Sequence, residues 1–228
     1  MKEEIKEPFD IKQLDELAQQ LRCPDGKQGV AIGKSLEDTN KRMILESIKS
    51  LEIKNKNRVL ELGHGNASHL PEILKRANEV KYFGMEISKV MQQESSRINA
   101  KYIKKKLASF QMYDGQNVPY VLNFFDRIIT VNTIYFWKNP TSFLNEIHRV
   151  LKPNGIFVVS FAISSFMKNL PFVSQTNVFN LYNNSTLEHL VANTQFELSD
   201  IKNKTERVKS KTGEWVDREY IIAVLHKK

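Results

Sequence analysis

One segment constrains the fold more than any other: Val59-Leu60-Glu61-Leu62-Gly63-His64-Gly65-Asn66-Ala67-Ser68. It joins a short apolar strand to a Gly-x-Gly turn that leads into a helix. Only a backbone without side chains turns so tightly and lets a ligand approach so closely. In open α/β sheets, ligands bind at the carboxyl ends of the strands, which is where this turn lies. The segment therefore predicts a ligand-binding turn at the end of the first strand of an α/β sheet.

The rest of the chain alternates short apolar runs with helical periodicity, which favours an α/β fold. Parallel strands are predicted over 58–62, 80–86, 107–112, 125–131 and 156–161. The helix after the fourth strand is expected to stop at 152–155. Two further strands, 196–201 and 220–225, are expected to form an antiparallel hairpin through the loop 202–215, with its turn at Gly213. The pattern predicts a mostly parallel, seven-stranded sheet with a terminal antiparallel hairpin.

The first fifty residues are predicted to form an N-terminal helical cap, 1–50, ahead of a ligand-binding domain, 51–228. One apolar helix face is expected at Leu14, Leu17, Ala18 and Leu21. Glycine and proline residues then predict breaks at Pro24, Gly26, Gly29 and Gly33. A second helix is expected to start at Ser35.

Composition narrows the class of protein. Hydrophobic residues make up 41% and charged residues 26% of 228 residues, an ordinary globular balance. No apolar stretch approaches the roughly 20 residues that span a bilayer, and the charged segment 1–7 does not resemble a secretory signal. The single cysteine, Cys23, excludes a disulfide framework. We therefore predict a soluble cytoplasmic protein with no membrane insertion, and the histidine and acidic residues predict no metal site.

The formal net charge of +8 is compatible with an anionic partner such as nucleic acid. The densest basic runs are 101–106 and 202–211. They mostly lack the interleaved aromatic and arginine residues that are typical of nucleic-acid surfaces. We interpret them as solvated surface segments and do not expect nucleic acid as a partner.

Two carboxylates indicate the charge of the ligand. Glu61 stands two residues before Gly63, where it suits a cation and would repel a pyrophosphate. The third glycine of the dinucleotide fingerprint is absent at Ser68. Glu86 ends the second strand about twenty residues later, where a carboxylate can accept both ribose hydroxyls. These features favour an adenosyl sulfonium, while a nucleotide-binding domain or a non-binding relative remains an alternative.

Five segments in order resemble the motifs of class I S-adenosyl-L-methionine (SAM)-dependent methyltransferases, over about residues 56–161. They are ELGHGNA (61–67), GMEIS (84–88), YDGQNVPY (113–120), FFDRIITVN (124–132) and HRVLKPNGIFVVS (148–160). The chain is most similar to the broad small-molecule group that includes quinone-ring methyltransferases. The resemblance implies a Rossmann-like, doubly wound fold, SAM as the cofactor and S-adenosyl-L-homocysteine as its product.

The resemblance also implies roles for individual residues. Glu86 would bind the ribose, Asp114 would accept a hydrogen bond from the adenine amino group, and Gly115 would lie near the ring. Ala67 replaces the family's last glycine. Asn154 replaces another, at a position where asparagine accepts a positive φ. The predicted cofactor-binding residues are Glu61, Gly63, His64, Gly65, Asn66, Glu86, Ile87, Asp114, Gly115 and Asn132.

Three nearby residues receive simpler interpretations. His64 either contacts the methionine moiety or points towards a lid, and the sequence leaves both open. His69 is expected to be an ordinary helix-face residue, and Asp126 is expected to anchor backbone at the start of the fourth strand.

The acceptor is expected over the ends of the fourth and fifth strands. Methyl transfer depends mainly on alignment and desolvation, so no general base is assigned. The candidates for the pocket wall are Asn132, Tyr135 and Trp137, although ordinary packing is an alternative. Asn132 and Tyr135 have the spacing of an Asn-Pro-Pro-Tyr motif, but both prolines are missing. We therefore do not expect methylation of nucleobase or amide nitrogen.

Two segments could close the pocket: the glycine-rich N-terminal region and 164–174. The second carries Phe166, Met167, Leu170 and Phe172. These predict a small-molecule methyl acceptor that is apolar or aromatic, although the same residues could form a homodimer contact or simple core. A methyltransferase acting on RNA or protein, and a non-catalytic SAM-binding protein, are the alternative functions.

Overall fold

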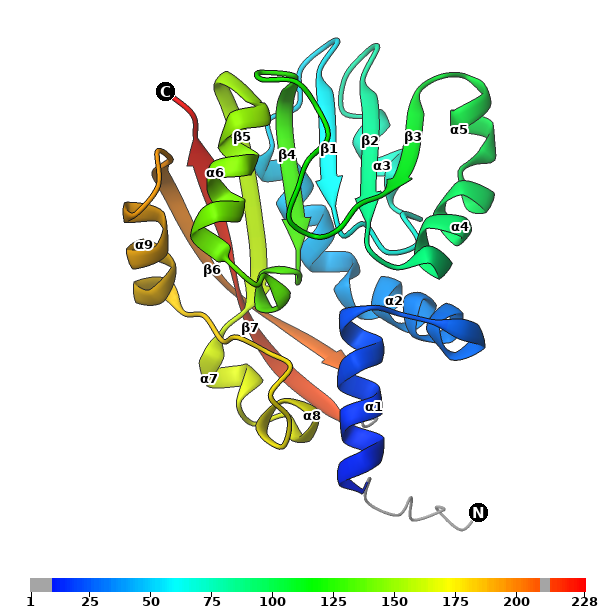
Figure 1. Cartoon of the computed structure of the whole chain (residues 1–228), viewed down its shortest axis with the longest axis vertical. Helices are drawn as coiled ribbons and strands as arrows, with labels where there is room; N and C mark the ends of the chain where they lie inside the picture. The colour runs from blue at the N-terminus through cyan, green and yellow to red at the C-terminus, as the bar shows by residue number, and fades with distance from the viewer. Residues whose placement is uncertain (1–9, 210–213) are drawn as a thin grey trace.

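The computed structural model describes residues 10–209 and 214–228. The expected turn at Gly213 and the charged segment 1–7 lie outside these ranges. The described chain forms one seven-stranded sheet in the order β3-β2-β1-β4-β5-β7-β6, with helices on both faces (Figure 1). The first five strands in sequence pair in parallel, and β7 pairs antiparallel with both β5 and β6. The prediction of a Rossmann-like, doubly wound sheet with a terminal antiparallel hairpin is confirmed.

The strands are β1 (Arg58–Leu62), β2 (Lys81–Glu86), β3 (Ala108–Met112), β4 (Phe125–Val131), β5 (Leu151–Ala162), β6 (Glu197–Lys209) and β7 (Trp215–His226). The longer helices are α1 (Ile11–Arg22), α2 (Gly26–Ser50), α4 (Lys89–Ile98), α6 (Pro140–Val150) and α9 (Asn184–Ala192). The short ones are α3 (Leu70–Leu74), α5 (Ala100–Lys104), α7 (Ser164–Met167), α8 (Pro171–Ser174) and the 3-10 turn η1 (Ile134–Phe136).

The central strands β1 and β4 are buried on both faces. Leu60 and Ile128 contribute to the hydrophobic cluster on one face, and Val59 and Ile129 contribute to the cluster on the other. Such continuous apolar runs are typical of parallel strands that are covered by helices on both sides. The carboxyl ends of β1, β2 and β4 consequently meet at one edge of the sheet, which faces α1, α2, α7 and α8 in Figure 1.

Helix α2 begins at Gly26, so the prediction of a helix start at Ser35 is wrong. Neither Gly29 nor Gly33 breaks the chain; both lie inside the helix. A Cβ atom on Gly29 would lie 2.8 Å from the carbonyl carbon of Pro24, and one on Gly33 would lie 2.6 Å from the sulfur of Met91. These glycines permit close packing of α2 against the preceding junction and α4, which a pattern of local breakers cannot reveal.

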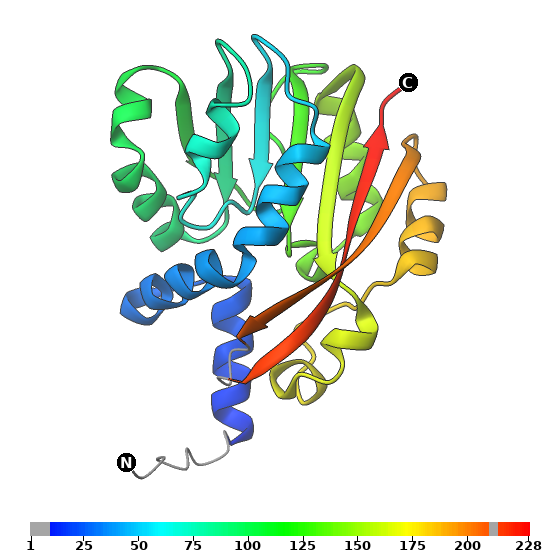
Figure 2. The same ribbon diagram turned by 180° about the vertical axis from the view of Figure 1, so that it is seen from behind.

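The terminal hairpin is longer than predicted. Strands β6 and β7 occupy most of the expected loop 202–215 and pair from Glu197↔His226 to Lys209↔Trp215, with one register shift between Leu198 and Asp200. The sequence hides these strands because their outer halves are polar, whereas strand signals depend on apolar alternation. Figure 2 shows the hairpin crossing beyond the sheet towards α1.

The start of β5 also differs from the prediction, because the expected stop at 152–155 lies within this strand. Asn154 has a φ of 61°, as predicted for the residue that replaces a glycine. Asp126 anchors the neighbouring backbone as expected: its Oδ2 accepts a hydrogen bond from the Arg58 amide at 2.8 Å.

The N-terminal helices contact the sheet over only part of their length. In the second half of α2, Met43 and Ile48 join a core cluster, and the hydroxyls of Ser47 and Ser160 lie 2.6 Å apart. Helix α1 and the first half of α2 extend past the carboxyl edge of the sheet (Figure 2). Among the described helices, none combines the length and apolar character needed to cross a membrane.

Candidate functional site

A cavity of about 240 Å³ lies at the carboxyl edge of the sheet, between the sheet and the N-terminal helices. Most of the predicted site residues line it, namely Glu61, Gly63, His64, Gly65, Asn66, Glu86, Ile87, Gly115, Asn132, Tyr135 and Trp137. We call the side formed by 61–66, 86–87 and 115 the glycine-turn end. The apolar end is formed by α7, α8, η1, the end of α1 and the β6–β7 hairpin.

The glycine turn keeps space open in the cavity wall. Gly63 has a φ of 70°, and a Cβ atom there would lie 2.5 Å from Cγ2 of Thr133. Ala67 also adopts a left-handed backbone, with a φ of 49°, and is fully buried. This conformation costs an ordinary residue roughly 1–2 kcal/mol, which explains why the corresponding family position is a glycine.

The Glu86 carboxylate holds the turn against the end of β2. Its Oε2 accepts a hydrogen bond from the Gly65 amide at 2.9 Å. Its Oε1 accepts from the amides of Ile87 at 2.7 Å and Ser88 at 3.0 Å. A carboxylate offers about four acceptor positions, so three bonds leave capacity for one more donor from a ligand.

Glu61 forms a buried network that the sequence did not reveal. The Nε2–H group of His69 donates to both of its carboxylate oxygens, at 2.8 and 3.0 Å, and the Tyr82 hydroxyl donates at 2.6 Å. The prediction that His69 is an ordinary helix-face residue is therefore wrong. It lies at the N-terminal end of α3, where its ring reaches back to β1. The only sequence signal for this contact was the presence of a histidine eight residues after Glu61.

The same network sets the charge of the pair. Burial acts to raise the pKa of Glu61, but the charge and hydrogen bonds of His69, together with Tyr82, outweigh it and lower that pKa. For His69, burial acts to lower the pKa, but the Glu61 carboxylate raises it overall. The two side chains therefore form an ion pair, and Glu61 is not an isolated negative charge.

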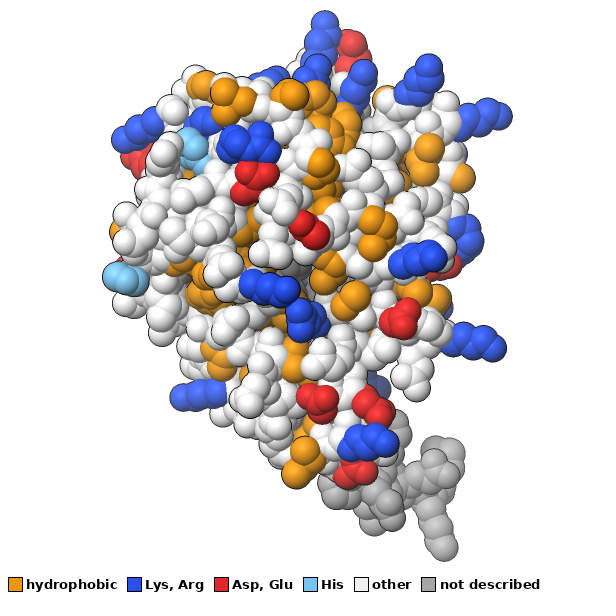
Figure 3. All heavy atoms as spheres, viewed as in Figure 1, with side chains coloured by type: hydrophobic (Ala, Val, Ile, Leu, Met, Phe, Trp, Pro, Cys, Tyr) orange, Lys and Arg blue, Asp and Glu red, His pale blue; other side chains and the backbone are white. Residues whose placement is uncertain are grey.

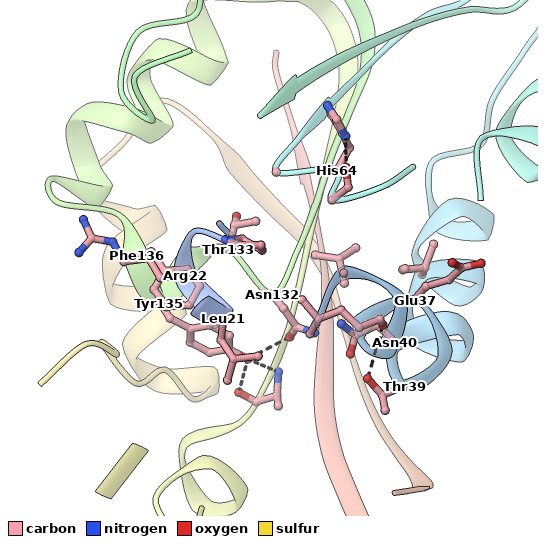
Figure 4. Close-up of a pocket in the computed structure, with 18 of the residues that line it drawn as sticks. Leu21, Arg22, Glu37, Thr39, Asn40, His64, Asn132, Thr133, Tyr135 and Phe136 are labelled. Carbon is pink, nitrogen blue, oxygen red and sulfur yellow. Dashed lines mark hydrogen bonds between the residues drawn. The ribbon is translucent and has the colours of Figure 1, made fainter. Parts of the chain in front are cut away.

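His64 is buried beside β2 and β3. Its Nδ1 donates to the Gly65 carbonyl at 2.7 Å, and its ring packs edge-on to Phe110 with 5.1 Å between centroids. Burial lowers the pKa of His64, against opposing effects of Glu86 and Glu61, which favours the neutral ring. In Figure 4 the ring points away from Asn132 and Tyr135.

Asn66 and Asp114 are held by different neighbours. The Asn66 amide donates to Glu37 of α2 at 2.9 Å, which connects the glycine turn to the N-terminal helices. Asp114 is exposed and is not among the residues that line the cavity, although Gly115 is. Its carboxylate accepts hydrogen bonds from the amides of Gln116 and Asn117.

At the junction of the two ends, Tyr135 is held by three hydrogen bonds. Its hydroxyl accepts from the Ala162 amide at 2.6 Å and lies 3.1 Å from both the Ala162 carbonyl and Asn132 Oδ1. Burial raises the pKa of Tyr135 far above neutrality. Trp137 packs edge-on to Phe143, with 4.9 Å between centroids. Both aromatic residues therefore serve as fixed walls.

The apolar end unites segments that are distant in sequence. The four residues expected to close the pocket, Phe166, Met167, Leu170 and Phe172, all line it. Sequence reasoning missed the hairpin residues Val208, Val216 and Arg218, because the strands that carry them were assigned to a loop. Within the described ranges, no three His, Cys, Asp or Glu side chains are grouped to hold a metal ion.

Charge on the outer surface is dispersed. On the face shown in Figure 3, the basic side chains are scattered over both the periphery and the middle and do not form a continuous patch. Lys104, Lys105 and Lys106 are exposed at the end of α5, as predicted for a solvated run.

Comparison with known proteins agrees with this geometry. A family model described as "Methyltransferase domain" matches residues 60–159, which span β1 to most of β5. The uncharacterized methyltransferase YdaC of Bacillus subtilis (strain 168) is 28% identical over 109 residues, covering 48% of this chain. The match spans 58% of the length of YdaC, just over half of that relative.

Two solved structures share the fold. A methyltransferase in complex with the Haloferax volcanii Trm112 methyltransferase activator superposes with a TM-score of 0.73 and 15% identity, covering 86% of this chain and 92% of that one. A SAM-dependent methyltransferase from Aquifex aeolicus has a TM-score of 0.60 and 17% identity, covering 95% and 99%.

These similarities do not distinguish a quinone-ring subgroup, which stays a prediction. The family match covers the glycine turn and the parallel strands, and the structural likeness extends over nearly the whole fold. Residues 60–159 therefore match a methyltransferase domain, and the chain has the fold of a SAM-dependent methyltransferase.

Proposed function

We propose that this protein transfers the methyl group of SAM to a small molecule with an apolar or aromatic body. One observation carries the proposal: a single cavity joins a polar glycine-turn end to an apolar end lined by Phe166, Met167, Leu170 and Phe172. The first end suits an adenosyl cofactor, and the second suits an apolar acceptor beside it. The match of residues 60–159 to a methyltransferase domain supports the identity of the cofactor.

The glycine-turn end fits the adenosyl group sterically. At Gly63 a side chain would enter the space beside Thr133, so the absence of one keeps the wall open. Glu86 retains one acceptor position, which we assign to a ribose hydroxyl. Ile87 and Gly115 line the same side and would flank the adenine. Asp114, whose Oδ2 has spare acceptor capacity, is the proposed partner of the adenine amino group.

The charge of this end also fits a cation. The carboxylates of Glu37, Glu61 and Glu86 line this end with His69 as a partly compensating cation, whereas the other cations of the lining belong to the apolar end, namely Arg22, Lys209 and Arg218. This net negative charge attracts a sulfonium and an ammonium and opposes a diphosphate. Asn66, His64 and Asn132 remain the proposed neighbours of the methionine part.

The protein's part in the reaction is alignment and exclusion of water. When bound, SAM supplies a methyl group on a positively charged sulfur. The glycine-turn end would hold the adenosyl group, and the apolar end would hold the acceptor with its nucleophilic atom towards the methyl group. Fixed walls at Tyr135 and Trp137 would hold the acceptor in line. The Tyr135 hydroxyl is fully engaged and has a raised pKa, so we assign it no role as a base.

Two measurements test the proposal. Calorimetry should detect binding of SAM, and uptake of NAD or ATP in its place would contradict it. Incubation with methyl-labelled SAM and a fractionated cell extract should then label a small molecule. Labelling confined to RNA, lost when Lys104 to Lys106 are replaced, would instead support a macromolecular acceptor. Tight SAM binding without labelling of any fraction would support a non-catalytic SAM-binding protein.

A further inference from the structure

The β6–β7 hairpin places a buried polar group, Arg218, in the apolar end. Side chains alternate across its outer half: Glu206 and Arg218 are buried and Val208 and Val216 half-buried, whereas 207, 209, 215 and 217 are exposed. Val208, Val216 and Arg218 line the cavity. Lys209 also lines the cavity but is exposed, so Arg218 is the buried cation of this hairpin within the described residues.

Four of the five N–H groups of Arg218 are occupied. Nε and Nη2 donate to Oε1 of Glu206 at 3.2 and 2.6 Å. Nη2 also donates to the Thr39 carbonyl at 2.7 Å, and Nη1 donates to Oδ1 of Asn40 at 2.8 Å. A guanidinium carries five N–H donors, so one hydrogen on Nη1 has no acceptor in the described part of the chain. Only 10% of the Arg218 side chain is exposed.

An apolar wall does not need this group for stability. A buried ion pair rarely stabilises a fold more than hydrophobic residues of similar volume, because both charges lose their hydration. Arg218 lines the apolar end beside Phe172 and Val216, and the two other cations of that lining, Arg22 and Lys209, are exposed. Burial raises the pKa of the Tyr135 hydroxyl, and the Arg218 guanidinium acts in the opposite direction, so the Arg218 field reaches the junction of the two ends.

We propose that Arg218 determines acceptor specificity by binding a singly charged oxygen, such as a carboxylate or phenolate, on an otherwise apolar molecule. The inference rests on the proposed function, since it names the substrate class of the same cavity. A guanidinium N–H binds an anionic oxygen more strongly than a neutral one and repels an ammonium.

Three matched probes test the charge preference: 3-phenylpropionate, 3-phenylpropanol and 3-phenylpropylammonium. Each is titrated calorimetrically into the protein saturated with S-adenosyl-L-homocysteine. We expect the carboxylate to bind best, and about tenfold more tightly than the ammonium, the scale of one charge-assisted hydrogen bond. Equal affinities, a preference for the ammonium, or no measurable binding of the carboxylate would overturn the inference.

Paired variants assign the preference to Arg218. The double variant Arg218→Met, Glu206→Gln removes the cation without leaving a buried unpaired carboxylate, and it should abolish the preference. The control is Arg207→Met, Asp217→Asn, which removes an exposed ion pair on the opposite face of the same hairpin and should preserve it. Persistence of the preference in the first variant would refute the role of Arg218.

Folding and cofactor binding are followed separately. Circular dichroism and affinity for S-adenosyl-L-homocysteine should match between the variants and the wild type. If the double variant does not fold, Arg218→Lys serves instead, and it should weaken carboxylate binding severalfold because an ammonium cannot reproduce the planar fork. Failure of the wild type to bind S-adenosyl-L-homocysteine would refute the proposed function, whereas the three probes on unloaded protein would still test Arg218.

Discussion

The two ends of the cavity are built from different chemical groups. At the glycine-turn end, much of the wall is backbone, and Glu86 alone engages the amides of Gly65, Ile87 and Ser88. At the apolar end, the wall is made of side chains from α1, α7–α8, η1 and the β6–β7 hairpin. A backbone wall recognises one ligand through fixed geometry, whereas a wall of side chains can change its specificity by substitution. The cofactor is therefore far easier to infer from this chain than the acceptor.

The difference between the two ends of the cavity predicts the largest loss of SAM affinity for a substitution at Gly63. Gly63→Val should weaken SAM binding by at least about 100-fold, because the side chain meets Thr133 and the backbone has a positive φ. Calorimetry and circular dichroism on the folded variant measure this. The matched variant Gly63→Ala with Thr133→Ser removes the methyl group in contact and should recover part of the affinity. Wild-type affinity in Gly63→Val would show that the turn does not bind the cofactor.

A free-energy change of similar size concerns the stability of the buried pair behind the turn. His69→Ala should lower the free energy of unfolding by about 3–5 kcal/mol, because it leaves Glu61 buried without its cation. Urea denaturation measures the change. Adding Glu61→Gln should recover part of the loss, since the uncompensated charge disappears. A change below about 1 kcal/mol in His69→Ala, the range of exposed pairs, would mean that the pair is solvated.

A smaller effect is expected for Glu86. Glu86→Ala should weaken SAM binding by roughly 1–3 kcal/mol, the scale of lost charge-assisted hydrogen bonds. Calorimetry tests this, and the melting temperature shows how far the freed amides of Gly65 and Ile87 destabilise the turn. Unchanged affinity in a variant of unchanged stability would exclude the ribose assignment.

The Glu61–His69 pair also predicts a pH window for stability. The lowered pKa of Glu61 gives a contribution that is present above the ordinary value of 4.5 and is lost as the pH falls through the folded-state pKa. The raised pKa of His69 gives a contribution that is present below 6.5 and is lost as the pH rises through its folded-state pKa. The difference in unfolding free energy between wild type and His69→Ala should therefore peak between pH 4.5 and 6.5. A difference independent of pH would contradict the ion pair.

The smallest predicted effect is on acceptor binding and tests whether the two ends of the cavity act independently. Leu170→Ala removes apolar wall at a half-buried position and should weaken binding of an apolar acceptor by about 1 kcal/mol. Affinity for SAM should not change, because the glycine-turn end keeps its contacts. Parallel titrations with SAM and with 3-phenylpropionate measure both. Equal losses for both ligands would show that the two ends are not independent.

The sequence predicted the elements whose causes are local. The apolar runs of β1 and β4 could be identified from neighbouring residues. Helix α2 could not, since Gly29 and Gly33 owe their place to contacts with Pro24 and Met91.

The residues of the candidate site also divide into those with local sequence signals and those that depend on distant contacts. The glycine turn and Glu86 could be predicted because they lie in compact motifs. The aromatic segments of the pocket could be predicted because each comes directly after a strand. The roles of His69 and Arg218 depend on partners that only the folded chain brings near, since Arg218 binds α2 some 179 residues away in sequence. No pattern of neighbouring residues signals such a contact.

The hydrogen bonds of Glu86 bear on the entropy of recognition. Because this carboxylate already bridges the turn and the end of β2, the loop is ordered when the chain folds, before any ligand arrives. An incoming molecule therefore meets a preorganised surface, and the entropy that association consumes is mostly its own. Such a site should bind by a simple one-step encounter, without a slow rearrangement of the protein.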